Sequence, residues 1–278
     1  MKRILVPTDF SEHANYATEV AAQIAKKHNA ELFLLHILDI ETYGGTGGQS
    51  VQDIPEGLFL LKLAQKRFDK LLKEPYLKGV KIVDAIQFET TYKNITSQAE
   101  KHKIDLIVMG THGVSGLKEV FVGSNTEKVV RIAQCPVLSV KQRHTDFSMK
   151  DVVFASNFKE EAYEAFPKFK ELVAMFKARV HLLCVSSPGH FHTTFQAEQD
   201  MQEFANCFEL ENYTINLYNE KDIETGVLRF SEAIMADVIA VSTHGRSGIS
   251  AILNASIANS LVNHADRPVL SMKVEEKG

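Results

Sequence analysis

The 278-residue sequence contains only three cysteines, and none of them belongs to a CxxC pair. Cys135, Cys184 and Cys207 each stand alone in apolar surroundings, which favours buried thiols in a reducing compartment over a zinc site or a disulfide framework. No stretch approaches the ~18 consecutive apolar residues of a membrane span. Only three apolar residues separate Arg3 from Pro7, too few for the apolar core of a signal peptide. We therefore expect a cytoplasmic protein that does not span a membrane.

The sequence also lacks an excess of basic residues. It has 31 Lys and Arg against 35 Asp and Glu, for a net charge of −4, and no long basic run. Because nucleic-acid-binding surfaces are strongly basic, we expect neither a nucleic acid nor a membrane as partner. Hydrophobic residues make up 45% and charged residues 24%, as in an ordinary globular protein, and the length suits two domains.

The chain repeats itself. The segment Pro-Val-Leu-Ser-Val-Lys at 136–141 returns as Pro-Val-Leu-Ser-Met-Lys at 268–273, and the same offset of 132 aligns 105–113 with 237–245. Nearer the N-terminus the offset is 148, which aligns 34–37 with 182–185, so the second copy is 16 residues shorter between its second and fourth strands. The repeat predicts two domains, 1–145 and 146–278, with their boundary in the polar stretch 142–150.

Short apolar runs alternate with longer amphipathic stretches in each copy, a pattern typical of βαβ units and a parallel sheet. In the first copy we expect helices from Ser11 and over 58–72, 95–101 and 124–132, and strands at 4–6, 32–37, 80–88, 104–109 and 137–140. Each copy is thus predicted to be a five-stranded α/β domain. The glycine-rich stretch 39–55 is either a mobile loop beside a binding site or a surface excursion.

The loop after the fourth predicted strand has the character of a phosphate-binding loop. Gly110 directly follows the apolar strand, and Gly123-Ser124 directly precedes a predicted helix. Glycine permits close backbone approach, and the amino end of a helix offers unpaired N–H groups to an anion. Ser124 and Thr126 add hydroxyl donors, so mainly neutral groups would hold a polyphosphate. The sequence lacks the GxxxxGK[ST] pattern, and a dinucleotide fingerprint would follow the first strand instead.

The spacing Gly110-x2-Gly113-x9-Gly123-Ser124 resembles the nucleotide motif of the universal stress protein family, G-x2-G-x9-G-[ST], at every position. The opening Ile-Leu-Val-Pro-Thr-Asp-Phe-Ser at 4–11 and Cys-Pro-Val-Leu at 135–138 also resemble this family, and the resemblance covers both copies. It implies two tandem five-stranded parallel-sheet domains of the adenine nucleotide alpha hydrolase-like type. It further implies that they pack as a pseudo-dimer through the edge strands at 136–141 and 268–273, with a further homodimer left open.

The resemblance implies that ATP binds between the ends of the first and fourth strands of the first copy, with any Mg²⁺ or Mn²⁺ held mainly by the phosphates. The implied contacts to adenine and ribose are Asp9, the backbone near Ile37, and the lining residues Pro7, Thr8 and Met109. Those implied around ribose and phosphates are Gly110, His112, Gly113, Gly123, Ser124, Asn125 and Thr126.

Asp9 fits a binding role independently, because it directly follows the first strand, where a carboxylate can accept from an amine or a ribose hydroxyl. Its alternative role is a turn or N-cap residue for the helix near Ser11, and the two roles are compatible.

The second copy departs from this pattern. Ser242 and Ala255 replace the first and third glycines, and Asn157 replaces the aspartate. Added Cβ atoms would obstruct the approach of the backbone to phosphate, and Asn157 removes a negative charge. We therefore predict that the second copy binds nucleotide weakly or not at all.

Two functions are compatible with these patterns. One is a cytoplasmic ATP-binding stress-response or regulatory protein with at most slow ATP hydrolysis; the other is a slow ATPase or hydrolase whose second domain is adapted to another ligand. Single histidines such as His112 and His244, and the pair His190-x-His192, lack the partners of a base or a metal site. Asp9 also lacks the acidic cluster of a receiver domain. We favour the first function, with no catalytic residue and no metal ligand assigned.

Overall fold

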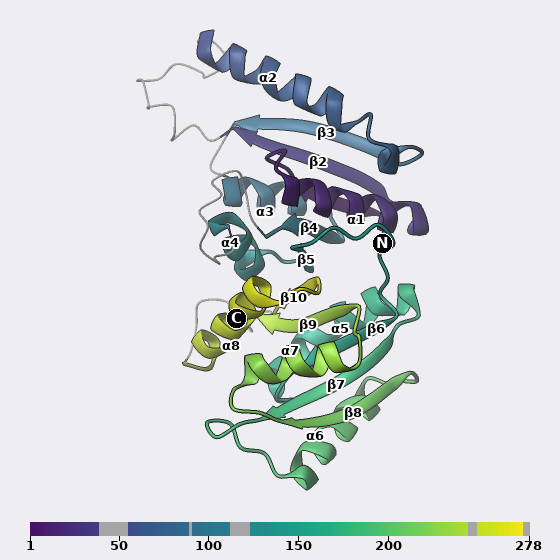
Figure 1. The fold of residues 1–278 in the computed structure, drawn as a ribbon, viewed down its shortest axis with the longest axis vertical. Helices are drawn as coiled ribbons and strands as arrows, with labels where there is room; N and C mark the ends of the chain where they lie inside the picture. The colour runs from purple at the N-terminus through teal and green to yellow at the C-terminus, as the bar shows by residue number, and fades with distance from the viewer. Residues whose placement is uncertain (39–54, 89–90, 112–122, 244–248, 275–278) are drawn as a thin grey trace. The chain divides into compact units, whose positions relative to one another are not determined.

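The computed structural model describes residues 1–38, 55–88, 91–111, 123–243 and 249–274, and these form two compact units (Figure 1). Unit 1 comprises Met1–Val129 and Val140–Phe147, and unit 2 comprises Val130–Ser139 and Ser148–Gly278. Strands and helices alternate along both units, so the predicted α/β class is confirmed. The predicted loop at 39–55 lies almost wholly outside the described residues, as do His112 and Gly113.

Unit 1 is built on a parallel sheet with strand order β3-β2-β1-β4. Its elements in chain order are β1 (Arg3–Pro7), α1 (Glu12–His28), β2 (Glu31–Leu38), α2 (Pro55–Leu71), the 3-10 turn η3 (Pro75–Leu77), β3 (Lys81–Phe88), α3 (Thr91–Lys101), β4 (Leu106–Gly110) and the start of α4 (Ser124–Ile132). Ile4, Val6 and Leu106 are fully buried, because helices cover both faces of a parallel sheet.

Unit 2 has the strand order β5-β10-β9-β6-β7-β8. Its further elements are β5 (Val137–Val140), β6 (Asp151–Ala155), α5 (Glu160–Phe176), β7 (Arg179–Ser186), α6 (Thr194–Cys207), β8 (Tyr213–Asn219), α7 (Ile223–Ala233), β9 (Val238–Thr243), α8 (Ile249–His264) and β10 (Val269–Lys273). The two repeated Pro-Val-Leu-Ser segments pair here: β5 runs antiparallel to β10, with Leu138 opposite Leu270. The other neighbours are parallel.

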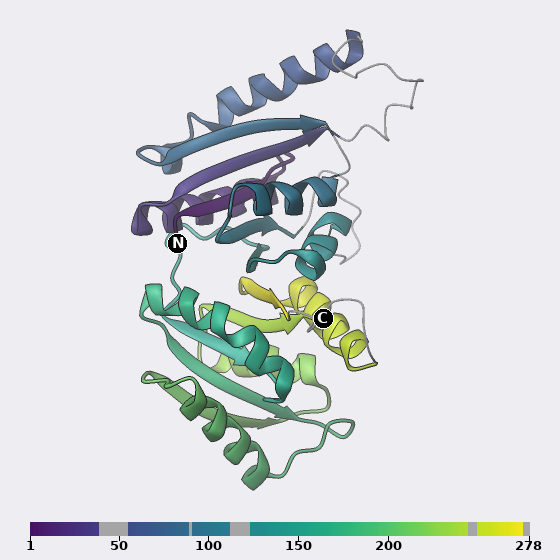
Figure 2. The same ribbon diagram turned by 180° about the vertical axis from the view of Figure 1, so that it is seen from behind.

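The helices of unit 2 cover both faces of its sheet. Helices α7 and α8 lie in front in Figure 1, and α5 and α6 lie in front in Figure 2, the view from behind. Strands β6 and β9 are adjacent in the sheet, but the helix that follows β6 (α5) and the helix that follows β9 (α8) lie on opposite faces of it. Such a reversal leaves the carboxyl ends of the two strands accessible between diverging connections.

The two units build corresponding first helices from different side chains. Helix α1 buries small residues against the sheet, among them Ala14, Ala17 and Ala21. Helix α5 instead buries Phe166 and Phe169, whose rings lie 5.0 Å from that of Phe154. Small residues let a helix backbone approach its sheet closely, and this closeness matters at the candidate site of unit 1.

Polar side chains hold the segment between the repeats against α1. The Gln23 side chain donates to the carbonyl of His144 at 2.6 Å and accepts from the N–H of Phe147 at 2.7 Å. Arg143 forms an ion pair with Glu19 at 2.8 Å. The predicted boundary at 145 thus falls in a stretch that belongs to unit 1 through Phe147, because hydrogen bonds replace the apolar contacts that the stretch lacks.

Candidate functional site

The carboxyl ends of β1 and β4 lie side by side in unit 1. Strand β1 pairs in parallel with β2 on one side and with β4 on the other, where Ile4 lies opposite Leu106 and Leu5 opposite Ile107. This register brings Pro7, at the end of β1, to the same edge as Gly110, at the end of β4. In open α/β sheets, ligands bind outside the carboxyl ends of strands at such a reversal point.

The turn that follows β1 is fixed by two short side chains. Thr8 Oγ1 accepts from the N–H of Phe10 at 3.0 Å, and Asp9 Oδ1 accepts from the N–H of Ser11 at 2.9 Å. Ser11 then caps α1 by accepting from the N–H of Ala14. Asp9 is therefore a turn residue and Ser11 is the N-cap. An ionised carboxylate accepts several hydrogen bonds, so the predicted ligand contact is compatible with the turn.

Gly110 is required by packing as well as by any ligand. A Cβ atom at this position would lie 2.6 Å from the carbonyl carbon of His13 and 2.9 Å from the backbone nitrogen of Ala14. These are backbone atoms of α1, and they cannot move away by a rotamer change as side-chain atoms can. From the sequence, Gly110 was expected only to let the backbone approach a phosphate. The structure shows in addition that β4 ends directly against the first turn of α1.

The amino end of α4 is joined to the end of β4 by hydrogen bonds. Thr126 is 4% exposed, and its hydroxyl donates to the carbonyl of Gly110 at 2.9 Å. Gly123 donates its N–H to the carbonyl of Thr111 at 2.7 Å. The Thr126 hydroxyl, expected from the sequence to donate to phosphate, thus already donates its proton within the protein. Asn125 is half-buried at the start of the helix, and the Ser124 side chain lies outside the described residues.

His36, for which the sequence predicted no role, lies close to this edge of the sheet. His36 in β2 is 8% exposed, and its Nδ1–H donates to the carbonyl of Thr8 at 2.7 Å. Its ring centroid lies 4.6 Å from that of Phe10. Burial lowers the pKa of His36, opposed by its hydrogen bond to Thr8. The signal available in the sequence was a histidine inside an otherwise apolar strand. In the structure this neutral imidazole supports the turn at Asp9 through its hydrogen bond to Thr8.

We expect acidification to destabilise the protein partly through His36. Since its folded-state pKa is lowered, the unfolded chain binds the proton more readily, so the stability contribution is present above the usual pKa of ~6.5 and is lost as the pH falls below it. The free energy of unfolding, measured with urea between pH 7 and pH 5, should fall less in His36→Gln than in the wild type. Some dependence will remain, because burial also lowers the pKa of His28. An equal fall in both proteins would contradict this assignment.

The corresponding turn in unit 2 is nearly identical. Ser156 Oγ accepts from the N–H of Phe158 at 3.1 Å, and Asn157 Oδ1 accepts from the N–H of Lys159 at 3.1 Å. Asparagine therefore preserves the turn that Asp9 makes in unit 1 but not its charge. His36 is replaced by Cys184, where burial raises the pKa of the thiol to about 11. A pocket of about 330 Å³ opens at this edge of unit 2.

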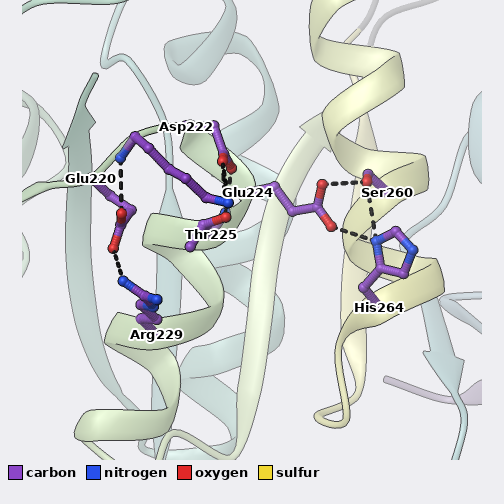
Figure 3. Close-up of polar contacts among 8 residues, drawn as sticks. Glu220, Asp222, Glu224, Thr225, Arg229, Ser260 and His264 are labelled. Carbon is purple, nitrogen blue, oxygen red and sulfur yellow. Dashed lines mark hydrogen bonds and ion pairs between the residues drawn. The ribbon is translucent and has the colours of Figure 1, made fainter. Parts of the chain in front are cut away.

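A serine, a histidine and a glutamate also meet between α7 and α8, as Figure 3 shows. Ser260 Oγ donates to Glu224 Oε2 at 2.5 Å, His264 Nδ1 lies 2.5 Å from Glu224 Oε1, and Ser260 Oγ lies 3.4 Å from the same Nδ1. In a hydrolase triad the serine and the acid contact opposite nitrogens of the imidazole. Here both approach Nδ1, and the serine proton is directed to the carboxylate. The cluster therefore joins two helices and does not have the geometry of an activated nucleophile.

The histidines of the predicted His190-x-His192 loop are held by backbone contacts. His190 and Ser187 exchange backbone hydrogen bonds of 2.9 and 3.1 Å, and the N–H of His192 donates to Ser186 Oγ. In the part of the chain that the structure describes, no group of three or more His, Cys, Asp or Glu side chains is arranged to hold a metal ion. None of the helices described there combines the length and apolar character needed to cross a bilayer.

This fold and these sequence features define a protein class. A model of the universal stress protein family matches residues 1–141 and again residues 149–273. The chain therefore belongs to the universal stress protein family, and it contains two tandem copies of the family's domain. This confirms the resemblance seen in the glycine motif and in the two ends of the first repeat.

Two relatives that are similar in sequence each align with about half of this chain. Universal stress protein MJ0531 of Methanocaldococcus jannaschii is 36% identical over 141 residues, which are 51% of this chain and 82% of the relative. A universal stress protein of Thermus aquaticus is 36% identical over 145 residues, 50% of this chain and 98% of the relative. The crystal structure of a universal stress protein from Archaeoglobus fulgidus covers 98% of both chains with a TM-score of 0.75 and 20% identity, a likeness of fold.

Proposed function

We propose that unit 1 binds ATP at the carboxyl ends of β1 and β4, and that the protein acts as a nucleotide-dependent regulatory or stress-response protein. The observation that carries the proposal is the position of Asp9. The turn after β1 holds its carboxylate at the reversal point of the sheet, through the 2.9 Å bond from Ser11, and the glycine motif of the family begins at the adjacent strand end, Gly110.

The other groups proposed to bind the nucleotide follow from the same edge of the sheet. Pro7, Thr8 and Met109 would line the base, with the backbone near Ile37 beside it. The amino end of α4 would face the phosphates with its partial positive charge, together with Gly123 and Asn125. Thr126, whose hydroxyl already donates to Gly110, would contribute by holding α4 to β4. Of the remaining residues implied by the family, His112 and Gly113 belong to the segment outside the described residues.

A divalent cation would enter this site with the nucleotide. In the proposed complex, Mg²⁺ or Mn²⁺ would be held mainly by phosphate oxygens. The protein's own groups would bind and orient the nucleotide, and no residue is assigned a catalytic role.

The test is the number of ATP sites in the full chain. We expect isothermal titration calorimetry with Mg-ATP to give one site per chain, because unit 2 has Asn157 in place of Asp9. Mass spectrometry of nucleotide released from the purified protein should identify an adenine nucleotide. Two equivalent sites per chain, or no measurable binding, would overturn the proposal, and rapid ATP turnover would favour an enzyme instead.

A further inference from the structure

Unit 2 contains a pocket of about 330 Å³ where the carboxyl ends of β6, β7 and β9 meet. This is the position that corresponds, by the internal repeat, to the proposed nucleotide site of unit 1. Its volume lies at the lower end of the ~300–1,000 Å³ typical of small-molecule sites. Most of its wall is aliphatic, with contributions from Leu183, Val185, Val227, Val241, Ile257 and Leu261.

The repeat shows which polar groups have been exchanged for apolar ones. The offset of 132 aligns Ile257 and Ala258 of this pocket with Asn125 and Thr126 of unit 1. Two side chains able to hydrogen bond, at the start of α4, thus correspond to two aliphatic side chains in the middle of α8. After β6, the uncharged Asn157 stands where unit 1 has the charged Asp9.

The described lining of the pocket offers a phosphate no permanently charged cation. None of the described residues that line it is a lysine or an arginine. Lys159, which follows Asn157 in the turn, is paired with Asp200 at 2.5 Å. An unpaired charge is costly to move from water into an apolar site. Among the described lining residues, a triphosphate would therefore find few groups to replace its hydration.

The polar residues of the described lining are Ser156, Asn157, His190, His192 and Ser242. His190 and His192 line the pocket from a turn that the backbone bonds to Ser186 and Ser187 hold in place. Phe191, between the two histidines, is 76% exposed, and Phe195 at the start of α6 is 77% exposed. The turn that lines the pocket thus combines hydrogen-bonding imidazoles with an exposed aromatic side chain.

The wall helices of the pocket are firmly joined. Glu224 of α7 contacts both Ser260 and His264 of α8 (Figure 3). Glu224 lies one helical turn before the lining residue Val227, and Ser260 directly precedes the lining residue Leu261. A Cβ atom on Gly226 would lie 2.5 Å from Val185 Cγ1, so α7 packs against β7 as closely as a glycine allows. These contacts favour a pre-formed pocket.

We infer that the pocket of unit 2 binds a small, largely apolar molecule that carries one hydrogen-bonding group and no phosphate. The aliphatic wall would bury the body of such a ligand, and Asn157 or the imidazoles of His190 and His192 would meet its polar group. The two repeats would then bind chemically different ligands at equivalent positions of the same fold. This inference does not depend on whether unit 1 binds ATP.

The test uses N-phenyl-1-naphthylamine, an uncharged fluorescent molecule with a single N–H donor, on the full-length protein. We expect saturable fluorescence enhancement with one site per chain, and no displacement by excess Mg-ATP. The double variant Ile257→Asn and Ala258→Thr, which installs the residues of unit 1, should weaken probe binding about tenfold, the effect expected when polar groups are buried against an apolar ligand. Ile257→Asn alone, at a half-buried position, serves if the double variant unfolds.

Met235→Ser is the matched control, because Met235 is a 75% exposed apolar residue of unit 2 outside the pocket lining. It should leave probe binding unchanged. Binding that survives both pocket variants, or that falls equally in Met235→Ser, would show adsorption to exposed apolar surface and overturn the inference. Competitive displacement by ATP would overturn it as well, by making unit 2 a nucleotide site. Nucleotide titration of unit 1 is a separate measurement, so the two proposals fail independently.

Discussion

Asp9→Asn is expected to weaken ATP binding by about 10- to 100-fold while leaving the fold intact. A hydrogen bond to a charged group contributes ~1.5–3 kcal/mol, and each ~1.4 kcal/mol changes an affinity tenfold. The fold should survive because the chain contains this substitution already: Asn157 makes the same turn in unit 2, with its Oδ1 accepting from the N–H of Lys159 at 3.1 Å. Calorimetric titration of the variant with Mg-ATP measures the loss.

The chain also supplies the control for this variant. Asn157→Asp restores the charge in unit 2, where the pocket otherwise has the apolar residues Ile257 and Ala258. It should create no ATP site of comparable affinity, because a single carboxylate does not supply donors to phosphate. Unchanged ATP affinity in Asp9→Asn would show that Asp9 serves only as the turn residue that the structure already displays.

Gly110→Ser is expected to destabilise unit 1 by about 1–3 kcal/mol, the usual cost of forcing extra atoms into a packed region. The added Cβ would lie within 2.6 to 2.9 Å of backbone atoms of His13 and Ala14, so α1 must shift away from the end of β4. That shift would also move the turn at Asp9, and ATP affinity should fall with stability. Urea unfolding followed by circular dichroism measures the first effect.

Gly189→Ser provides the comparison, since a Cβ atom at Gly189 would meet nothing within 4 Å. Its unfolding midpoint should match that of the wild type. If Gly110→Ser were as stable as Gly189→Ser but bound ATP poorly, the glycine would be required by the ligand rather than by α1. The two measurements together therefore separate the packing role of Gly110 from its predicted phosphate role.

Much of the fold could be predicted because each element has a local pattern. The predicted helix at 124–132 and strand at 137–140 coincide with α4 and β5, and the predicted strand at 32–37 differs from β2 by one residue at each end. Apolar runs of strand length and apolar spacing of helical period depend on neighbouring residues only. The repeat added the tandem organisation, since similar sequences adopt similar folds.

The candidate site was predictable only in part. Asp9 and Gly110 could each be placed at the end of a predicted strand, because that depends on neighbouring residues only. The contact of Gly110 with α1 instead joins positions about a hundred residues apart in the chain. The hydrogen bond from Thr126 to Gly110, and the burial of His36 beneath Thr8, likewise depend on which strands are neighbours. No local pattern specifies such contacts.

The sequence by itself determined the family, the two repeats and the substitutions that distinguish them, because these are properties of residue identity and spacing. Only the tertiary structure decided what those substitutions do. Asn157 keeps the turn of Asp9, and Ile257 and Ala258 become the wall of a pocket. The physical reason is that a binding site is formed by groups from several strands and helices, and its chemistry is set by what packing brings together at one edge of a sheet.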